Sequence, residues 1–170
     1  MKNKVLFIAI CVVVALTSCQ KKGLNLFQGD YSYKTSGSVT ITEVPTENDS
    51  VSMSFGVDLN NEIGHLEIVT LDKKNDSVLV VMNAMGGKVN VACARVENDK
   101  IHFADFPKKL QIISLNPSLE LECDVSVRAE GSMYNGNTLL VRMVYEGTCR
   151  IVNKEFAIYG ADITMAATRN

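Results

Sequence analysis

Cysteine has the widest choice of chemistry among the residue types of this chain, and its five copies fall into two groups. Cys11 and Cys19 lie near the N-terminus, whereas Cys93, Cys123 and Cys149 are spread over the second half of the chain. A thiol can be acylated, oxidised to a disulfide, bind a metal or act as a nucleophile, depending on its surroundings. The sequence around each cysteine therefore indicates which of these reactions it can undergo.

Cys19 directly follows a segment with the pattern of an export signal. Met1-Lys2-Asn3-Lys4 is cationic, and Val5–Leu16 is an uninterrupted apolar run. This run is too short for a permanent membrane-spanning helix, which needs about 20 residues, but it suits the hydrophobic region of a secretory signal. We therefore expect residues 1–18 to form a helical signal peptide. The alternative is a plain secretory signal or an N-terminal anchor in which the cysteine occurs by chance.

Leu16-Thr17-Ser18-Cys19 resembles the bacterial lipobox, whose pattern is leucine, a small or β-branched residue, a small residue and cysteine. The resemblance implies that the Cys19 thiol carries a diacylglyceryl group, that the signal is cut before Cys19, and that the new amine is acylated. Each buried CH₂ adds about 0.8 kcal/mol, so two or three acyl chains would hold the protein on a membrane. A membrane is therefore the first expected partner.

The residues after the lipobox indicate which membrane this is. Gln20 differs from the aspartate that retains many lipoproteins at the inner membrane, which favours the outer membrane. Lys21-Lys22 lack the acidic cluster that resembles the surface-export signal of Bacteroidetes lipoproteins. We expect a lipid-anchored envelope protein at the outer membrane, facing the periplasm. Residues 19–29 are interpreted as the lipidated N-terminus and tether, and residues 30–170 as a single all-β domain.

The three later cysteines are predicted to point into the core of this domain. By alternation, Cys93 shares a strand face with Val89 and Val91, Cys123 with Leu121 and Val125, and Cys149 with Tyr145 and Ile151. Their spacing matches no zinc-binding pattern, and a buried thiol is unreactive because burial raises its pKa. One pair among the three could form a disulfide in an oxidising compartment. We favour free core thiols over a disulfide.

The other residue types that carry catalysis form no recognisable constellation. His65 and His102 are the only histidines, and both are interpreted as solvent-side residues without a metal-binding motif. Glu120, Glu122 and Asp124 follow one strand at a spacing of two, a pattern that could bind a cation but more often forms a solvated face. No glycine-rich phosphate loop or inward pair of carboxylates stands out. We therefore expect no enzyme, no metal site and no cofactor.

Charge and composition narrow the classes of partner. Residues 19–170 carry fifteen basic and nineteen acidic side chains, a net charge of −4 with histidine neutral. A nucleic-acid partner would need a basic face, so we expect none. The chain has no tryptophan and only 6% aromatic residues, which argues against a carbohydrate platform built on stacked indoles.

One short sequence occurs twice. Asn48-Asp49-Ser50-Val51 and Asn75-Asp76-Ser77-Val78 each lead into a predicted strand. Turn formation explains both copies, because Asn, Asp and Ser side chains bond to nearby backbone groups. Each Asp-Ser-Val also resembles the O-glycosylation motif of periplasmic Bacteroidetes proteins, which would make Ser50 and Ser77 glycosylation sites. We favour the turn interpretation.

From Asp30 onward, apolar residues alternate with polar ones, which is the period of a strand with one buried face. Strands are predicted over residues 31–44, 51–59, 64–71, 77–83, 88–96, 101–103, 110–114, 119–127, 138–151 and 155–165. Asn135-Gly136 favours a type I′ hairpin turn. The connections leave no room for the crossover helices that parallel sheets require. The fold class is therefore all-β, an antiparallel meander of about 8–10 strands that forms a barrel or a two-sheet β-sandwich.

With its lipobox and strand meander, the chain resembles the small lipocalin-like (calycin-like) lipoproteins of Bacteroidetes. Phe27-Gln28-Gly29-Asp30-Tyr31 resembles the Gly-x-Trp that opens the first lipocalin strand, with tyrosine in place of tryptophan. The resemblance implies a barrel whose interior binds a lipid or other small apolar ligand, lined by Met53, Phe55, Phe103, Tyr145 and the inward cysteines. The same residues could instead fill a solid core, which we favour. The chain would then be a structural or interaction lipoprotein accessory to an envelope complex.

Overall fold

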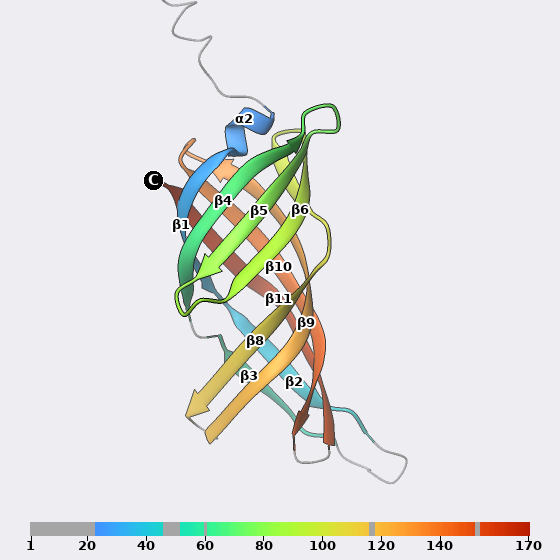
Figure 1. The fold of residues 1–170 in the computed structure, drawn as a ribbon. Coiled ribbons are helices and arrows are strands. Elements are labelled where there is room, and N and C mark those ends of the chain that lie inside the picture. Colours follow the sequence, from blue (N-terminus) through green and yellow to red (C-terminus); the bar gives the residue numbers. More distant parts are fainter. Residues whose placement is uncertain (1–22, 46–51, 60, 116–117, 152–153) are drawn as a thin grey trace, which may run out of the picture.

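The computed structural model describes residues 23–45, 52–59, 61–115, 118–151 and 154–170. This part of the chain forms one short helix and a series of antiparallel strands (Figure 1). The elements are α2 (Leu24–Phe27), β1 (Gly29–Ser36), β2 (Ser38–Glu43), β3 (Ser54–Asp58), β4 (Glu62–Asp72), β5 (Ser77–Ala84), β6 (Val89–Glu97), β7 (Lys100–Phe103), β8 (Phe106–Leu115), β9 (Ser118–Tyr134), β10 (Thr138–Ile151) and β11 (Lys154–Arg169). No helix within these ranges has the length and apolarity needed to cross a membrane.

A subset of the strands closes into an antiparallel barrel. The order around it is β1-β4-β5-β6-β7-β9-β10-β11, and β11 pairs back with β1, where Tyr31 lies opposite Arg169. Tight turns join neighbouring strands: Asn135 and Gly136 have φ angles of 52° and 69°, the left-handed values of a type I′ turn. The predicted antiparallel barrel is confirmed, and the alternative of a two-sheet sandwich is wrong.

Three long strands carry the sheet beyond the barrel. β9, β10 and β11 have 17, 14 and 16 residues. The C-terminal part of β9 pairs with β7, and its N-terminal part pairs with β8. Likewise, the C-terminal part of β11 pairs with β1, and its N-terminal part pairs with β2. With β3 beside β2, this continuation of the same sheet has the order β8-β9-β10-β11-β2-β3, and we call it the lower extension (Figure 1). Its edges are β8 and β3.

Gly37 is the point at which the chain passes from the barrel to the lower extension. The sequence predicts one strand over residues 31–44, but the structure divides it into β1 and β2. Gly37 has a φ angle of 146°, and a Cβ atom there would lie 2.7 Å from the backbone oxygen of Asp162. Only glycine fits this close crossing of two backbones, so the break in the strand is a consequence of the sequence.

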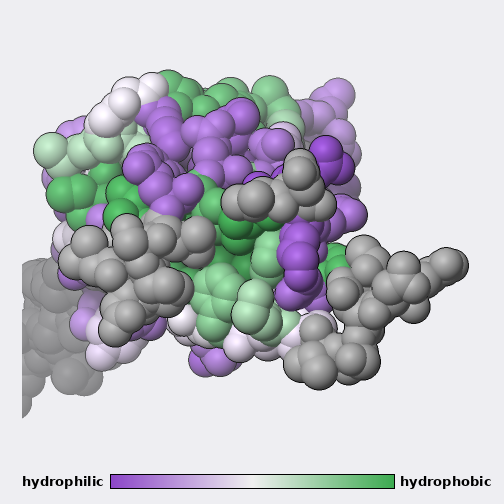
Figure 2. All heavy atoms as spheres, turned by 90° about the horizontal axis from the view of Figure 1, so that it is seen from below, coloured by the Kyte–Doolittle hydropathy of each residue, from purple (hydrophilic) through white to green (hydrophobic). Residues whose placement is uncertain are grey.

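The core runs from the barrel into the lower extension. Inside the barrel, large side chains that are at most 1% exposed pack together: Tyr31, Leu66, Ile68, Ile101, Leu139, Ile163 and Met165. Ile41, Val57, Ile112, Val125 and Phe156 continue the same cluster below. Seen from below, hydrophobic residues occupy the middle of the molecule (Figure 2). Large buried side chains therefore line the interior of the barrel.

The folded domain begins before the predicted boundary at residue 30. α2 lies over the upper end of the barrel, and Phe27 is fully buried (Figure 1). The Tyr31 hydroxyl donates a hydrogen bond to the backbone oxygen of Phe27 at 2.6 Å. The prediction that the tether extends to residue 29 is therefore wrong, because the apolar residues Leu24, Leu26 and Phe27 pack against the core.

Candidate functional site

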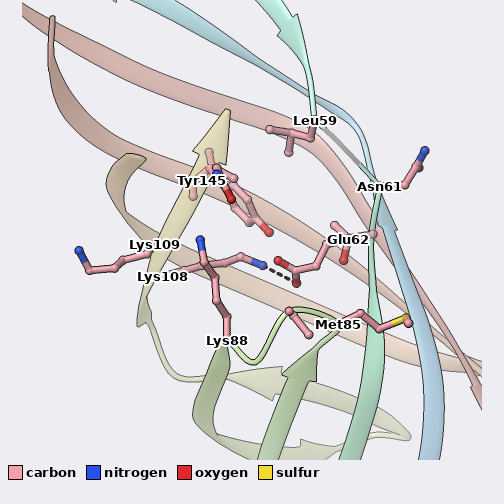
Figure 3. A pocket seen from close by; sticks show the side chains of 13 residues that line it. Leu59, Asn61, Glu62, Met85, Lys88, Lys108, Lys109 and Tyr145 are labelled. Carbon is pink, nitrogen blue, oxygen red and sulfur yellow. Dashed lines mark hydrogen bonds and ion pairs between the residues drawn. The ribbon is translucent and has the colours of Figure 1, made fainter. Parts of the chain in front are cut away.

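A cavity of about 270 Å³ lies where the barrel meets the lower extension (Figure 3). Five segments line it: the end of β1 at Thr35, the approach to β4, the turn between β5 and β6, the middle of β8, and Tyr145 of β10. The lining residues include Leu59, Asn61, Glu62, Met85, Lys88, Lys108, Lys109, Leu110 and Tyr145. Side chains from distant parts of the sequence thus meet at the lower mouth of the barrel.

A buried ion pair forms the wall of this cavity. The Lys108 Nζ atom lies 2.8 Å from Glu62 Oε1, and the Lys108 and Glu62 side chains are only 7% and 27% exposed. Lys108 is buried because it lies on the inward face of β8, the same face that carries the buried Phe106 and Leu110. A buried charge is unfavourable unless it is paired, and even a buried pair loses hydration free energy. Apolar side chains at these positions would avoid this desolvation cost.

Two tyrosines contact this ion pair. The Tyr33 hydroxyl donates a hydrogen bond to Glu62 Oε1 at 3.0 Å. The Tyr145 ring lies beneath Lys108, with Nζ 5.7 Å from the ring centroid, a distance at which a cation is attracted to the ring face. Burial and the Glu62 carboxylate raise the pKa of both phenols above the ordinary value of 10.0. Both hydroxyl groups are therefore neutral near pH 7 and act as donors.

Two further lysines lie at the rim of the cavity. The Lys88 side chain extends over the opening, whereas the Lys109 Nζ atom points away from Glu62 (Figure 3). Lys109 is exposed and pairs with Glu122 at 2.9 Å and with Asp124 at 3.7 Å. A second depression of about 390 Å³ shares Lys88, Lys108 and Lys109 with the first. The side chains of these three lysines thus border both hollows.

Leu59, Leu110 and Met85 supply the apolar part of the lining. Met85 is 73% exposed, so its thioether is available to a ligand at the opening. A small amphipathic molecule could place an anionic group near Lys108 and Lys88 and its apolar part against these side chains. Glu62 would accept a hydrogen bond from a ligand hydroxyl or amine, since it is the acceptor within the wall.

Of the four residues that were predicted by name to line a ligand site, one lines the cavity and three lie elsewhere. Tyr145 lines the cavity, as expected. Phe103 is buried against Phe106, with ring centroids 6.3 Å apart, and Phe55 is half-buried against the core. The inward prediction for Met53 is wrong: its side chain is 59% exposed, because β3 begins only at Ser54 and the alternation does not extend beyond the strand.

The prediction for the three domain cysteines is correct for two of them. Cys123 and Cys149 are buried, but Cys93 is exposed. Cys93 does share a face with Val89 and Val91, as the alternation predicts, yet these valines are 58% and 52% exposed. The smaller residues of the other face, including Ala92 and Ala94, point into the barrel instead.

The remaining predicted positions show no site. His65 is exposed, and His102 Nδ1 lies 3.3 Å from Glu130 Oε2 at the surface. Within the described ranges, no three His, Cys, Asp or Glu side chains gather as at a metal site. Ser77 donates a hydrogen bond to the backbone oxygen of Asn75 at 3.2 Å, which agrees with the turn interpretation. Cys19 and Ser50 lie outside the described residues.

The sequence interpretation missed Glu62, Lys108 and Tyr33. One signal was present: Lys108 has the parity of Phe106, Leu110 and Ile112, which marks it as an inward lysine if the predicted strand is extended towards its N-terminus. Its partner Glu62 lies 46 residues away in the chain, and only the closed topology brings the two together.

Comparison of the chain with models of known protein families gives no match, and comparison with curated protein sequences gives none either.

Proposed function

We propose that this protein is a lipid-anchored binding module of the cell envelope, with a lipocalin-like barrel that takes a small amphipathic ligand at its lower mouth. The observation that carries the proposal is the buried Lys108–Glu62 pair in the wall of an open cavity. Ionisable groups that are held in a cleft at an energetic cost are typical of functional sites. Large buried side chains occupy inward positions around the barrel axis, so we place the ligand at the mouth and not along the axis.

The lipid anchor is supported by the lipobox-like Leu16-Thr17-Ser18-Cys19. Because α2 begins at Leu24, the link from Cys19 to the domain is five residue steps, which span at most about 18 Å. α2 lies at the upper end of the barrel and the cavity at the lower mouth (Figure 1). An outer-membrane anchor on Cys19 would thus leave the cavity facing the periplasm, and the ligand would arrive from that side.

The chemistry of the lining suggests the class of ligand. The ammonium groups of Lys88 and Lys108 favour a carboxylate or phosphate group, and Leu59, Leu110 and Met85 favour a short apolar chain or ring. Ligand cavities usually measure about 300–1,000 Å³, so a cavity of about 270 Å³ fits a ligand at the small end of this range. A small lipid or lipid-like acid meets both conditions.

Native mass spectrometry of the chain extracted from its own host tests the proposal. We expect a co-purifying small molecule, and we expect octanoic acid to bind the emptied protein. Lys108→Met should weaken that binding by about tenfold or more, because it removes a charged donor. Lys74→Ala is the matched control, since Lys74 is exposed in the turn between β4 and β5. A wild-type chain that binds neither molecule would overturn the proposal.

A second candidate function is a solid interaction module accessory to an envelope complex. One observation favours it: the outer face of β4 and β6 carries exposed aliphatic side chains, with Leu71 57%, Val89 58% and Val91 52% exposed. Exposed apolar residues that gather on one face are typical of protein contact sites. Capture of one stoichiometric envelope partner by the wild-type chain, abolished by Val91→Lys, would support this function over the first.

A further inference from the structure

Cys123 and Cys149 lie side by side on neighbouring strands. The pairing of β9 with β10 reaches Asp124 opposite Thr148, and the two cysteines are the next residues in this register. The two thiols lie close enough for each to perturb the pKa of the other. Directly opposite residues of antiparallel strands have Cα atoms about 4.5 or 5.5 Å apart, and disulfides span Cα separations of about 4.4–6.8 Å. Continued by one pair, this register gives the two cysteines the backbone spacing that a disulfide needs.

The surroundings of the two thiols are closed. Cys123 and Cys149 are 2% and 8% exposed. On the far side of each, Leu110 of β8 lies opposite Cys123 and Phe156 of β11 lies opposite Cys149, and both are buried. Cys93, by contrast, lies on the outer face of β6 opposite Leu79. Among the three domain cysteines, only one pair is thus placed for a bond.

We propose that Cys123 and Cys149 form a disulfide in the mature protein and that Cys93 keeps a free thiol. The bond would form by thiol–disulfide exchange: one cysteine thiolate attacks a protein disulfide oxidant of the envelope and forms a mixed disulfide with it. The second cysteine then attacks its partner's sulfur in that mixed disulfide and releases the oxidant's thiol. The two cysteines lose two protons and two electrons, and the oxidant is reduced to a dithiol. The presence of this oxidant depends on the proposed envelope location, whereas the geometry of the cysteine pair does not.

Burial indicates when the exchange occurs. It raises the pKa of the Cys123 thiol to about 12 and also raises that of Cys149, so the reactive thiolate is scarce in the folded protein. The exchange must therefore take place before β8 and β11 enclose the two sulfur atoms. The finished bond would then be shielded from reductants. It would join β9 to β10 one residue beyond Asp124, which pairs with Lys109 of the cavity rim.

Alkylation of the full chain, extracted from the envelope and denatured without reductant, tests the bond. We expect a label on Cys93 and a disulfide-linked peptide pair that contains Cys123 and Cys149. In parallel, the reduced full chain is refolded in a buffer of reduced and oxidised glutathione, which supplies the oxidant independently of cellular location. Free Cys123 and Cys149 in both samples, or bonds that include Cys93, overturn the pairing. Free thiols in the envelope sample alone overturn the bond in the mature protein and count against the proposed location.

Thermal unfolding provides a second measurement that does not depend on labelling. Cys123→Ala and Cys149→Ala should each lower Tm by roughly 10 °C, and the double variant by no more than either, because all three lack the same constraint. Reductant present during refolding should lower the Tm of the wild type but not of the double variant. Cys93→Ala is the matched control and should leave Tm unchanged. Additive losses together with a wild type insensitive to reductant overturn the proposal.

Discussion

The guanidinium group of Arg169 lies over the ring of Tyr31, with Cζ 5.2 Å from the ring centroid and Nη2 2.7 Å from the hydroxyl oxygen. This contact joins the last strand of the barrel to the first. The same Nη2 atom donates to the backbone oxygens of Leu26 at 2.6 Å and Gln28 at 3.2 Å. One side chain therefore holds α2 over the upper end of the barrel and fastens the seam between β1 and β11.

Replacement of Arg169 should loosen this end of the barrel. Arg169→Ala leaves the partly buried oxygens of Leu26 and Gln28 without their charged donor, and we expect a loss of about 2–3 kcal/mol in the free energy of unfolding. Urea denaturation would measure the loss, and hydrogen exchange should accelerate at the amides of residues 26–28. Arg142→Ala is the matched control, since Arg142 is exposed on β10. Equal losses for the two variants would contradict the assigned role.

Glycines at backbone crossings should be far less replaceable than open ones. A Cβ atom on Gly64 would lie 2.2 Å from the backbone oxygen of Asn83 and 2.9 Å from the Tyr33 ring, whereas one on Gly56 meets nothing within 4 Å. Gly64→Ala should therefore cost about 3 kcal/mol or more, as overpacking against fixed backbone does. Gly56→Ala should change stability by less than about 1 kcal/mol. Urea denaturation of both variants checks the contrast, and similar values would show that β4 can move away from β5.

Strand alternation predicted the fold class but could not decide which face of β6 is buried. Val89, Val91 and Cys93 share one face, and Ala92 and Ala94 share the other, so both faces are apolar. The structure turns the alanines inward, where large side chains such as Tyr31 and Met165 already occupy the barrel. This choice depends on the volumes of residues on other strands, which a pattern along one strand does not contain.

The candidate site was less predictable than the fold, for a related reason. Tyr145 was predicted to point inward because its own strand alternates cleanly. Tyr33 and Glu62 meet only because β1 pairs with β4 around the inserted hairpin of β2 and β3. The sequence shows that each of these strands exists, but not which of them become neighbours.

High pH should destabilise the protein through its buried tyrosines. Burial raises the pKa of Tyr33 and Tyr145 above 10.0, the value expected in the unfolded chain. Below pH 10 both phenols are protonated in the folded and in the unfolded state, so their contribution to the free energy of unfolding is fully present. Above it the unfolded state loses protons that the folded state keeps, and stability falls by up to about 1.4 kcal/mol per pH unit for each such group.

Urea denaturation between pH 8 and pH 11 would measure this loss. Tyr33→Phe should make the dependence on pH less steep, because it removes one of the groups that ionise on unfolding. Tyr134→Phe is the control, since Tyr134 is 58% exposed. An identical slope in wild type and Tyr33→Phe would show that Tyr33 does not carry the effect.

The Lys108–Glu62 pair should behave as a coupled unit in which either single change is worse than both together. Glu62→Gln leaves the Lys108 ammonium group, whose side chain is 7% exposed, without its carboxylate. Lys108→Met leaves Glu62, among the described residues, with the Tyr33 hydroxyl as its one side-chain donor. We expect each single variant to lose about 2–3 kcal/mol, because removing one partner of a buried pair strands the other charge. The double variant should lose less than the sum, so that urea denaturation yields a coupling energy of about 1–3 kcal/mol. The exposed pair of Lys100 and Glu130, with side chains 52% and 48% exposed, serves as the matched control and should show coupling below about 1 kcal/mol. Additive losses at Lys108 and Glu62 would show that water screens the pair, and the cavity wall would then lack the buried charge on which the proposed binding site depends.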